Sequence, residues 1–146
     1  MGYYTDYSLS ISYCSVVNGV FKETSMKDVP KERIDALKRE IEKMQVFAYV
    51  TVEPGCNYGD AWVNAKWYDH DEDMLALSCR FPDFFFTLNG AGEEQGDLWN
   101  TYYYNGKMQE CRAEIIWPDF DYKKLVSSDY SADNKLRSPN YRYSYE

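Results

Sequence analysis

The stretch TDYSLSISY, residues 5–13, alternates between apolar and polar side chains almost without interruption. Its apolar members are Tyr7, Leu9, Ile11 and Tyr13, and the residues between them are Asp6, Ser8, Ser10 and Ser12. Alternation with a period of two residues is typical of a strand with one buried face. We therefore expect a half-buried strand here, and the rest of the fold has to cover its apolar side.

A helix is expected on the C-terminal side of this strand, over about residues 29–44. Asn18-Gly19 breaks the alternation, and Asp28 and Pro30 supply helix start signals. One stripe of the helix holds the apolar residues Ile34, Leu37, Ile41 and Met44, while charged residues cover its other faces. This helix is thus expected to pack one side against the sheet.

The remaining elements follow from β-branched runs, turn signals and a second helical stretch. Strands are expected at residues 46–52, 62–68 and 84–88, and a hairpin is expected to join residues 98–104 to 108–117 through Asn105-Gly106. A helix over residues 70–80 is expected to begin with Asp69 as its N-cap and Glu72 as its capping-box partner. Its inner face is expected to hold Met74, Leu75, Leu77 and Ser78.

This order of elements, β-α-β-β-α-β followed by a hairpin, predicts an α+β fold of the ferredoxin-like class. In that arrangement two helices cover one face of an antiparallel sheet, and the added hairpin either extends the edge of the sheet or folds over its open face. We expect a single domain over residues 1–118. The Tyr- and Ser-rich residues 119–146 are expected to form a poorly ordered tail, apart from one helical turn near residues 121–125.

The negative charge of the chain is concentrated in one segment. The 146 residues carry a net charge of −8 at pH 7. Residues 44–110 hold only three basic residues (Lys66, Arg80 and Lys107) against eleven acidic ones, which accounts for the whole imbalance. Such a segment repels phosphate backbones and anionic lipid, so we expect no direct binding to nucleic acid or membrane. It is either a solvated acidic surface or a surface for a basic partner.

No motif for catalysis, metal or cofactor binding stands out. The four cysteines, at positions 14, 56, 79 and 111, form no CxxC pair and are expected to be free thiols. The acids of residues 69–73 lack the glycine and glutamate of a calcium loop, and the only histidine, His70, is expected to lie on the surface at a helix start. No apolar run approaches the ~20 residues that span a bilayer.

The candidate binding residues are acidic or aromatic. Glu93, Glu94 and Asp97 lie in a glycine-rich loop that is either a plain turn or a mobile acidic loop for a partner, with Asp60 as a neighbour. Their carboxylates oppose a phosphate, which argues against a nucleotide cradle. If the strand phases hold, one sheet face carries Tyr49, Trp62, Phe85, Trp99 and Tyr103, with Lys66 on the Trp62 side of its strand. These rings are either packed beneath the hairpin or form a binding platform.

Three stretches carry a resemblance to known sequences: WYDHDEDM (residues 67–74), FPDFFFTLNGAGEEQGDLW (81–99) and YYYNGKMQ (102–109), with MGYYTDYSLSI at the start. Together they resemble a family of small uncharacterised proteins of phages and bacterial mobile elements. The chain is also distantly similar to ferredoxin-like domains of plasmid and phage accessory proteins. The resemblance implies a viral or mobile-element accessory protein, and it implies no mechanism.

In that setting a small acidic protein without catalytic residues is expected to act by binding a host protein. An acidic surface can occupy the basic channel of a nucleic-acid-binding defence protein, and its charge speeds encounter. We therefore expect an anti-CRISPR-like inhibitor of a host defence effector, not an enzyme, working without a cofactor in the cytoplasm of a bacterial host cell. The alternative is a binder of a small, nucleotide-type ligand in an aromatic pocket. An assembly role and a homodimer are left open.

Overall fold

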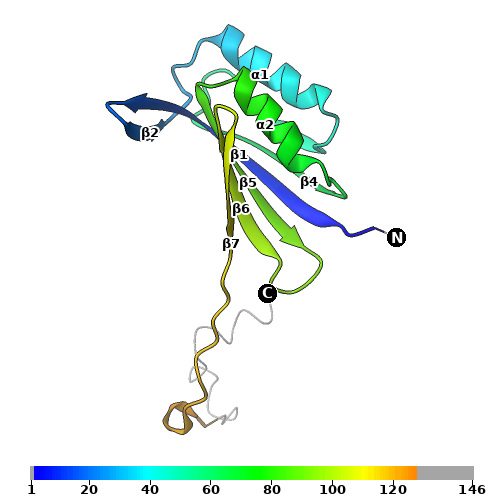
Figure 1. Cartoon of the computed structure of the whole chain (residues 1–146), viewed down its shortest axis with the longest axis vertical. Coiled ribbons are helices and arrows are strands. Elements are labelled where there is room, and N and C mark those ends of the chain that lie inside the picture. The colour runs from blue at the N-terminus through cyan, green and yellow to red at the C-terminus, as the bar shows by residue number, and fades with distance from the viewer. Residues whose placement is uncertain (1, 128–146) are drawn as a thin grey trace. The chain divides into compact units, whose positions relative to one another are not determined.

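The long strand β1 (Thr5–Val17) lies at the centre of a seven-stranded antiparallel sheet in the computed structural model, which describes residues 2–127 (Figure 1). The other strands are β2 (Val20–Thr24), β3 (Tyr49–Thr51), β4 (Gly59–Ala65), β5 (Phe84–Gly92), β6 (Leu98–Tyr104) and β7 (Lys107–Arg112). Two helices, α1 (Lys31–Lys43) and α2 (His70–Arg80), complete the first of two structural units, which ends at Ile115. The α+β class with an antiparallel sheet is therefore confirmed.

The strands follow the order β3-β4-β1-β5-β6-β7, and β2 pairs with the far end of β1. One segment of β1 is bonded on both sides, because Thr5 pairs with Ala65 of β4 and with Gly92 of β5. The β6–β7 hairpin continues the sheet at its edge next to β5. Of the two positions considered for this hairpin, the structure therefore has the one that extends the sheet.

Both helices cover the same face of the sheet (Figure 1). The alternation in β1 determines this face, because Tyr7, Leu9 and Ile11 are buried while Ser8 and Ser10 are exposed. Each helix contributes a buried stripe to the core, namely Ile34, Leu37 and Ile41 from α1 and Met74, Leu77 and Ser78 from α2. Within residues 2–127 no helix covers the opposite face, which carries exposed polar side chains along β1 and β4.

A strand that the sequence analysis missed, β2, forms a hairpin with β1. Asn18 and Gly19 have φ angles of 54° and 77°, the left-handed values that a two-residue hairpin turn of type I′ needs. In the sequence this Asn-Gly pair indicates only a break, because the residues beside it do not alternate. Val17 and Val20, which pair across the turn, are both more than half exposed. The absence of a buried face thus removed the periodic signal.

Other strand boundaries differ from expectation by a few residues. Strand β3 is limited to Tyr49–Thr51, β4 begins and ends three residues earlier than expected, and β7 ends at Arg112 rather than near 117. Strand β5 runs through Asn89-Gly90, which we read as its end. Gly90 is needed there for a different reason: a Cβ at this position would overlap the ring of Trp99 on β6. A glycine that looks like a turn signal instead makes room for a neighbouring side chain.

The second unit begins at Ile116, and its described part ends at residue 127. It contains a short 3-10 turn, Tyr122–Lys124, whose preceding Asp121 accepts a hydrogen bond from the Lys123 N–H at 3.0 Å. This is the helical turn expected near residues 121–125. The predicted disorder of the tail concerns mainly residues 128–146, which lie outside the described residues. Neither α1 nor α2 is long and apolar enough to cross a membrane.

Candidate functional site

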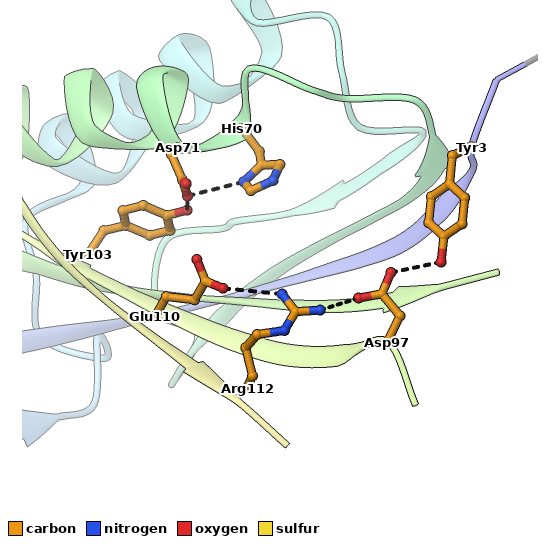
Figure 2. Close-up of polar contacts among 7 residues, drawn as sticks. All are labelled: Tyr3, His70, Asp71, Asp97, Tyr103, Glu110 and Arg112. Atoms are coloured by element: carbon orange, nitrogen blue, oxygen red, sulfur yellow. Dashed lines mark hydrogen bonds and ion pairs between the residues drawn. The ribbon is translucent and has the colours of Figure 1, made fainter. Parts of the chain in front are cut away.

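A polar pocket of about 310 Å³ lies where the N-terminal residues, the start of α2 and strands β6 and β7 meet. We call it the corner pocket. Its lining combines aromatic rings with ionisable groups, and it consists of Tyr3, Thr5, Tyr7, Tyr68, His70, Asp71, Asp97, Trp99, Glu110 and Arg112. Figure 2 shows two chains of polar contacts at this site, one reaching from α2 to β6 and the other from β7 to the N-terminal residues.

The first chain joins His70 and Asp71, the first two residues of α2, to Tyr103 of β6 (Figure 2). The hydroxyl of Tyr103 donates to Asp71 Oδ1 at 2.5 Å, and His70 Nδ1 lies 3.1 Å from the same oxygen. Tyr103 is fully buried, so desolvation, followed by the Asp71 carboxylate, raises the pKa of its hydroxyl far above the usual value. Tyr103 therefore stays a neutral donor that holds Asp71 in place.

The second chain runs from Glu110 through Arg112 and Asp97 to Tyr3. The Arg112 guanidinium donates to Glu110 at 3.2 Å and to Asp97 at 2.5 Å, and Tyr3 donates its hydroxyl to the other Asp97 oxygen at 2.8 Å. The carboxylates of Glu110 and then Asp97 raise the pKa of Arg112, so this side chain remains a cation. The Glu94 N–H lowers the pKa of Tyr3, but desolvation and Asp97 outweigh it and leave the pKa raised.

Aromatic rings surround His70. The Trp99 ring stacks on the imidazole with 5.0 Å between centroids and 22° between planes, and Tyr7 lies 5.6 Å away. The Tyr7 hydroxyl donates to the Trp67 carbonyl at 3.0 Å, and its burial raises the pKa of this phenol. The side chain of His70 is only 22% exposed. His70 lies at a helix start as expected, but it is half-buried and not fully at the surface, because its ring packs against Trp99 of β6.

Two of the acids at the start of α2, Asp71 and Asp73, bind buried aromatic residues, and the helix has no side-chain cap. Asp69 occupies the N-cap position but makes no side-chain capping bond, so the predicted capping box with Glu72 is wrong. Asp71 instead binds Tyr103, and Asp73 accepts a hydrogen bond from the indole N–H of Trp67 at 2.7 Å. Two buried aromatic donors thus bind Asp71 and Asp73, while the two acids expected to cap the helix, Asp69 and Glu72, make no capping bond.

The predicted acidic loop lies beside the corner pocket, and two of its carboxylates are engaged in hydrogen bonds within the fold. Glu93 accepts the backbone N–H of Tyr4 at 2.6 Å, and Asp97 is held by Tyr3 and Arg112. Glu94 is exposed, and its backbone N–H donates to the Tyr3 hydroxyl. The loop therefore anchors the N-terminal residues and leaves Glu94 facing solvent.

The other predicted acidic neighbour, Asp60, is remote from this loop. It pairs with Ser10, five residues along β1 from the pair between Thr5 and Gly92, or roughly 17 Å at about 3.3 Å per residue. Trp62 is 45% exposed on the sheet face away from the helices, and Lys66 lies over the Tyr4 ring at 5.1 Å. These three residues belong to a different surface from the corner pocket.

The expectation that five aromatic side chains share one face is wrong for two of them. Trp99 and Tyr103 are 8% and 0% exposed and lie on the helix-covered face, opposite Tyr49, Trp62 and Phe85. The phase of β6 is reversed because Gly90, the cross-strand partner of Trp99, leaves room for its ring on the inner side. Trp99 therefore lines the corner pocket from within the core, and Tyr103 supports it.

Sequence reasoning missed Tyr3, Asp71, Glu110 and Arg112 as parts of one site. One signal was present for two of them, since a two-residue turn at Asn105-Gly106 fixes the register of β6 and β7. That register pairs Trp99 with Arg112 and Thr101 with Glu110. No local signal brings Tyr3 or Asp71 to this hairpin, because their positions depend on how the N-terminal residues and α2 pack.

A second hollow, of about 410 Å³, lies on the face away from the helices. We call it the apolar groove, and its lining is Phe21, Phe85, Tyr102, Tyr104, Lys107, Met108 and Gln109. The Phe85 and Tyr102 rings are stacked at 5.8 Å, and Phe21 meets Phe85 edge-on at 5.0 Å. Aromatic rings thus dominate this hollow, whereas ionisable groups dominate the corner pocket.

All four cysteines are free, and residues 2–127 contain no group of three or more side chains arranged to hold a metal ion. Comparison with family models, with curated proteins and with solved structures finds no match to this chain. The function therefore has to be argued from the site itself.

Proposed function

We propose that this protein acts by binding another protein, and that its partner presents a basic surface. The observation that carries the proposal is the corner pocket, where the side chains of Asp71, Asp97 and Glu110 line one hollow together with a single arginine. The exposed Glu94 lies in the adjoining loop. A negative, ring-lined hollow of this kind attracts cations and repels phosphate groups, which favours a basic protein over nucleic acid as the partner.

The partner that fits these properties in a phage or mobile-element setting is a host defence effector with a basic channel. The resemblance of WYDHDEDM and the neighbouring motifs supports that setting. The function is then anti-CRISPR-like inhibition in the bacterial cytoplasm, achieved by occupying the channel and not by catalysis. Opposite charges on the two surfaces raise the association rate, and salt screens this effect.

The proposal includes a ferredoxin-like core for the fold. It is supported by the neighbours of β1, since the order β5-β1-β4-β3 with α1 and α2 as the crossovers matches a split β-α-β arrangement. Strands β2, β6 and β7 are then additions to that core. The corner pocket lies where these additions meet the core, because β6 and β7 supply Trp99, Glu110 and Arg112 while β1 and α2 supply Tyr7 and Asp71.

A small-ligand binding protein is the second candidate function, and the apolar groove favours it. Its stacked rings suit a planar ligand, and Lys107 is the one cation in its lining. A single lysine is a weak site for the phosphates of a nucleotide, which usually bind several cations. Calorimetric titration with a panel of nucleotides tests this candidate separately from the first.

The test of the proposed function uses cells that carry defined defence systems. We expect the protein to restore phage plating against at least one system and to retain an effector of that system in a pull-down. The double variant Glu94→Lys/Glu110→Lys should weaken retention most at low salt, whereas Glu32→Lys/Glu42→Lys at exposed positions of α1 makes the same charge change elsewhere and should not. Failure to bind or inhibit any effector would refute the proposal, as would equal retention of both variants.

A further inference from the structure

The corner pocket fits one particular side chain of a basic partner. We infer that it receives an arginine, whose guanidinium stacks on the pocket's rings and is bound by the carboxylates of Asp71 and Glu110. This inference rests on the proposed function, because it names the chemical group by which the partner is held.

The charges of the pocket favour a cation. Three carboxylates and one guanidinium line it, and the carboxylates retain acceptor capacity. Within residues 2–127, the hydrogen bonds made to Asp71 use its Oδ1 and those made to Glu110 use its Oε2. The second oxygen of each carboxylate is therefore open to a further donor. An anionic ligand would be repelled by both of these carboxylate oxygens.

The rings add a second attraction for a cation. A guanidinium over the face of a tyrosine or tryptophan is stabilised by the negative charge density of that face. Tyr68 is 68% exposed, so its ring is accessible to a partner, whereas Trp99 is nearly buried and covered on one side by His70. Tyr68 is therefore the ring that we expect to contact the bound side chain, and the carboxylates are expected to bind its nitrogen atoms.

Arg112 shows that a guanidinium can bridge two carboxylates of this pocket, Asp97 and Glu110. One such group contacts Asp97 and Glu110 at the same time, so a planar fork of N–H donors spans two carboxylates of this pocket. A lysine ammonium is a compact charge without that fork, and it stacks less well on aromatic rings. The site should therefore prefer arginine to lysine. Arg112 also binds Glu110, one of the two carboxylates assigned to the partner's arginine, and its own charge repels a second cation, so its removal should strengthen binding of an external arginine.

The experiment titrates the full chain, labelled with ¹⁵N, with three small probes by nuclear magnetic resonance. The probes are N-acetyl-argininamide, the matching lysine amide and the matching citrulline amide, which has the shape of arginine without its charge. The signals followed are the backbone amides of residues 68–71, 97–99 and 110–112 and the indole N–H of Trp99. We expect saturable shifts there with the arginine probe, weaker binding of the lysine probe and none of the citrulline probe.

The substituted side chains are exposed, so we expect each variant to fold and any change in binding to reflect the site itself. Glu110→Gln and Tyr68→Leu should each weaken the arginine probe by about fivefold, the order expected for one partly screened ion pair or one cation–π contact. Glu72→Gln removes an acid from the same helix start outside the pocket and should bind as the natural chain does, whereas Tyr68→Phe keeps the ring and should bind the probe more tightly than Tyr68→Leu does. Arg112→Gln should bind the probe several-fold more tightly.

The most decisive result is whether Arg112→Gln raises or lowers the affinity for the arginine probe. Weaker binding in this variant, equal binding of arginine and citrulline, or no shift at the corner with any probe would each overturn the arginine site. The proposed function fails differently. If the Glu94→Lys/Glu110→Lys variant loses its effector while the arginine probe fails to bind, the inference is wrong and the proposed function stands.

Discussion

The hydrogen bond between Tyr103 and Asp71 ties α2 to β6, and removing it should cost measurable stability. Tyr103→Phe deletes a hydroxyl that is fully buried and donates to a carboxylate at 2.5 Å. Hydrogen bonds to charged groups contribute about 1.5–3 kcal/mol. The Asp71 side chain is 38% exposed, so water can replace part of the lost bond. We therefore expect the low end, about 1.5 kcal/mol, or roughly 6 °C in melting temperature for a domain of this size.

Substitutions of Asp71, the acceptor of this hydrogen bond, measure its contribution to stability a second time. Asp71→Ala leaves the buried Tyr103 hydroxyl without an acceptor, which should cost about 2–3 kcal/mol, whereas Asp71→Asn keeps an acceptor oxygen and should cost less. In the double variant Tyr103→Phe/Asp71→Ala the buried hydroxyl and its acceptor are both removed, so its loss should be smaller than the sum of the two single losses; the contact of His70 with Asp71 is lost in both Asp71→Ala chains and cancels in the cycle. We expect a coupling energy of about 1–1.5 kcal/mol.

The assay is urea denaturation followed by tryptophan fluorescence, with each variant fitted to a two-state transition at a common m-value. The four chains needed are the natural sequence, the two single variants and the double variant. A coupling energy below about 0.5 kcal/mol would refute the reasoning, because it would mean that water satisfies both groups as well as they satisfy each other.

Three further predictions concern other contacts. Burial, followed by the charges of Asp83 and Glu23, raises the pKa of the Cys14 thiol to about 11. The thiol therefore loses its proton at a lower pH in the unfolded chain than in the folded chain. As pH rises from about 9 to 11, the free energy of unfolding should fall by about 2–3 kcal/mol. Denaturation at several pH values should show a shallower fall for Cys14→Ala, and equal slopes would contradict the assignment. Arg33→Lys should cost about 1 kcal/mol, because lysine cannot reproduce the two bonds of Arg33 to Asp83 at 2.6 and 3.1 Å or its stacking on Phe81 at 4.8 Å. A change below 0.3 kcal/mol would count against this, on the scale of an exposed ion pair. Gly90→Ala should cost about 1–3 kcal/mol and alter the near-ultraviolet circular dichroism of Trp99, since the added methyl group overlaps that ring; an unchanged spectrum would show that the ring has room to move.

The helices and the central strand were predictable because each buries one regular face. Ile34, Leu37 and Ile41 recur at helical spacing and are fully buried in α1, and Tyr7, Leu9 and Ile11 do the same at strand spacing in β1. Where an element has no buried face, as in β2, the pattern carries no periodic signal. The reliable predictions are thus those in which burial, not local propensity, selects the residues.

The candidate site was predictable only in part, because it is formed by contacts far apart in the sequence. Charge counting identified residues 44–110 as acidic, but Asp83 and Glu53 are paired with Arg33 and Lys38 of α1, which lie outside that segment. Asp97 is likewise paired with Arg112. Counting charges within residues 44–110 therefore overestimates the number of acidic side chains without a basic partner. The positions of Tyr3 and Asp71 depend on tertiary packing, which no spacing rule supplies.

The central position of β1 determines the order in which this chain can fold as it is synthesised. Thr5 is synthesised well before its partners Ala65 and Gly92. Before β4 is synthesised, β1 can pair only with β2, and before β5 is synthesised one edge of β1 still lacks its native partner. Pairings between residues so distant in sequence form slowly, on the order of milliseconds to seconds. The serines that alternate with Tyr7, Leu9 and Ile11 keep one face of the unpaired strand hydrated until Gly92 has been synthesised.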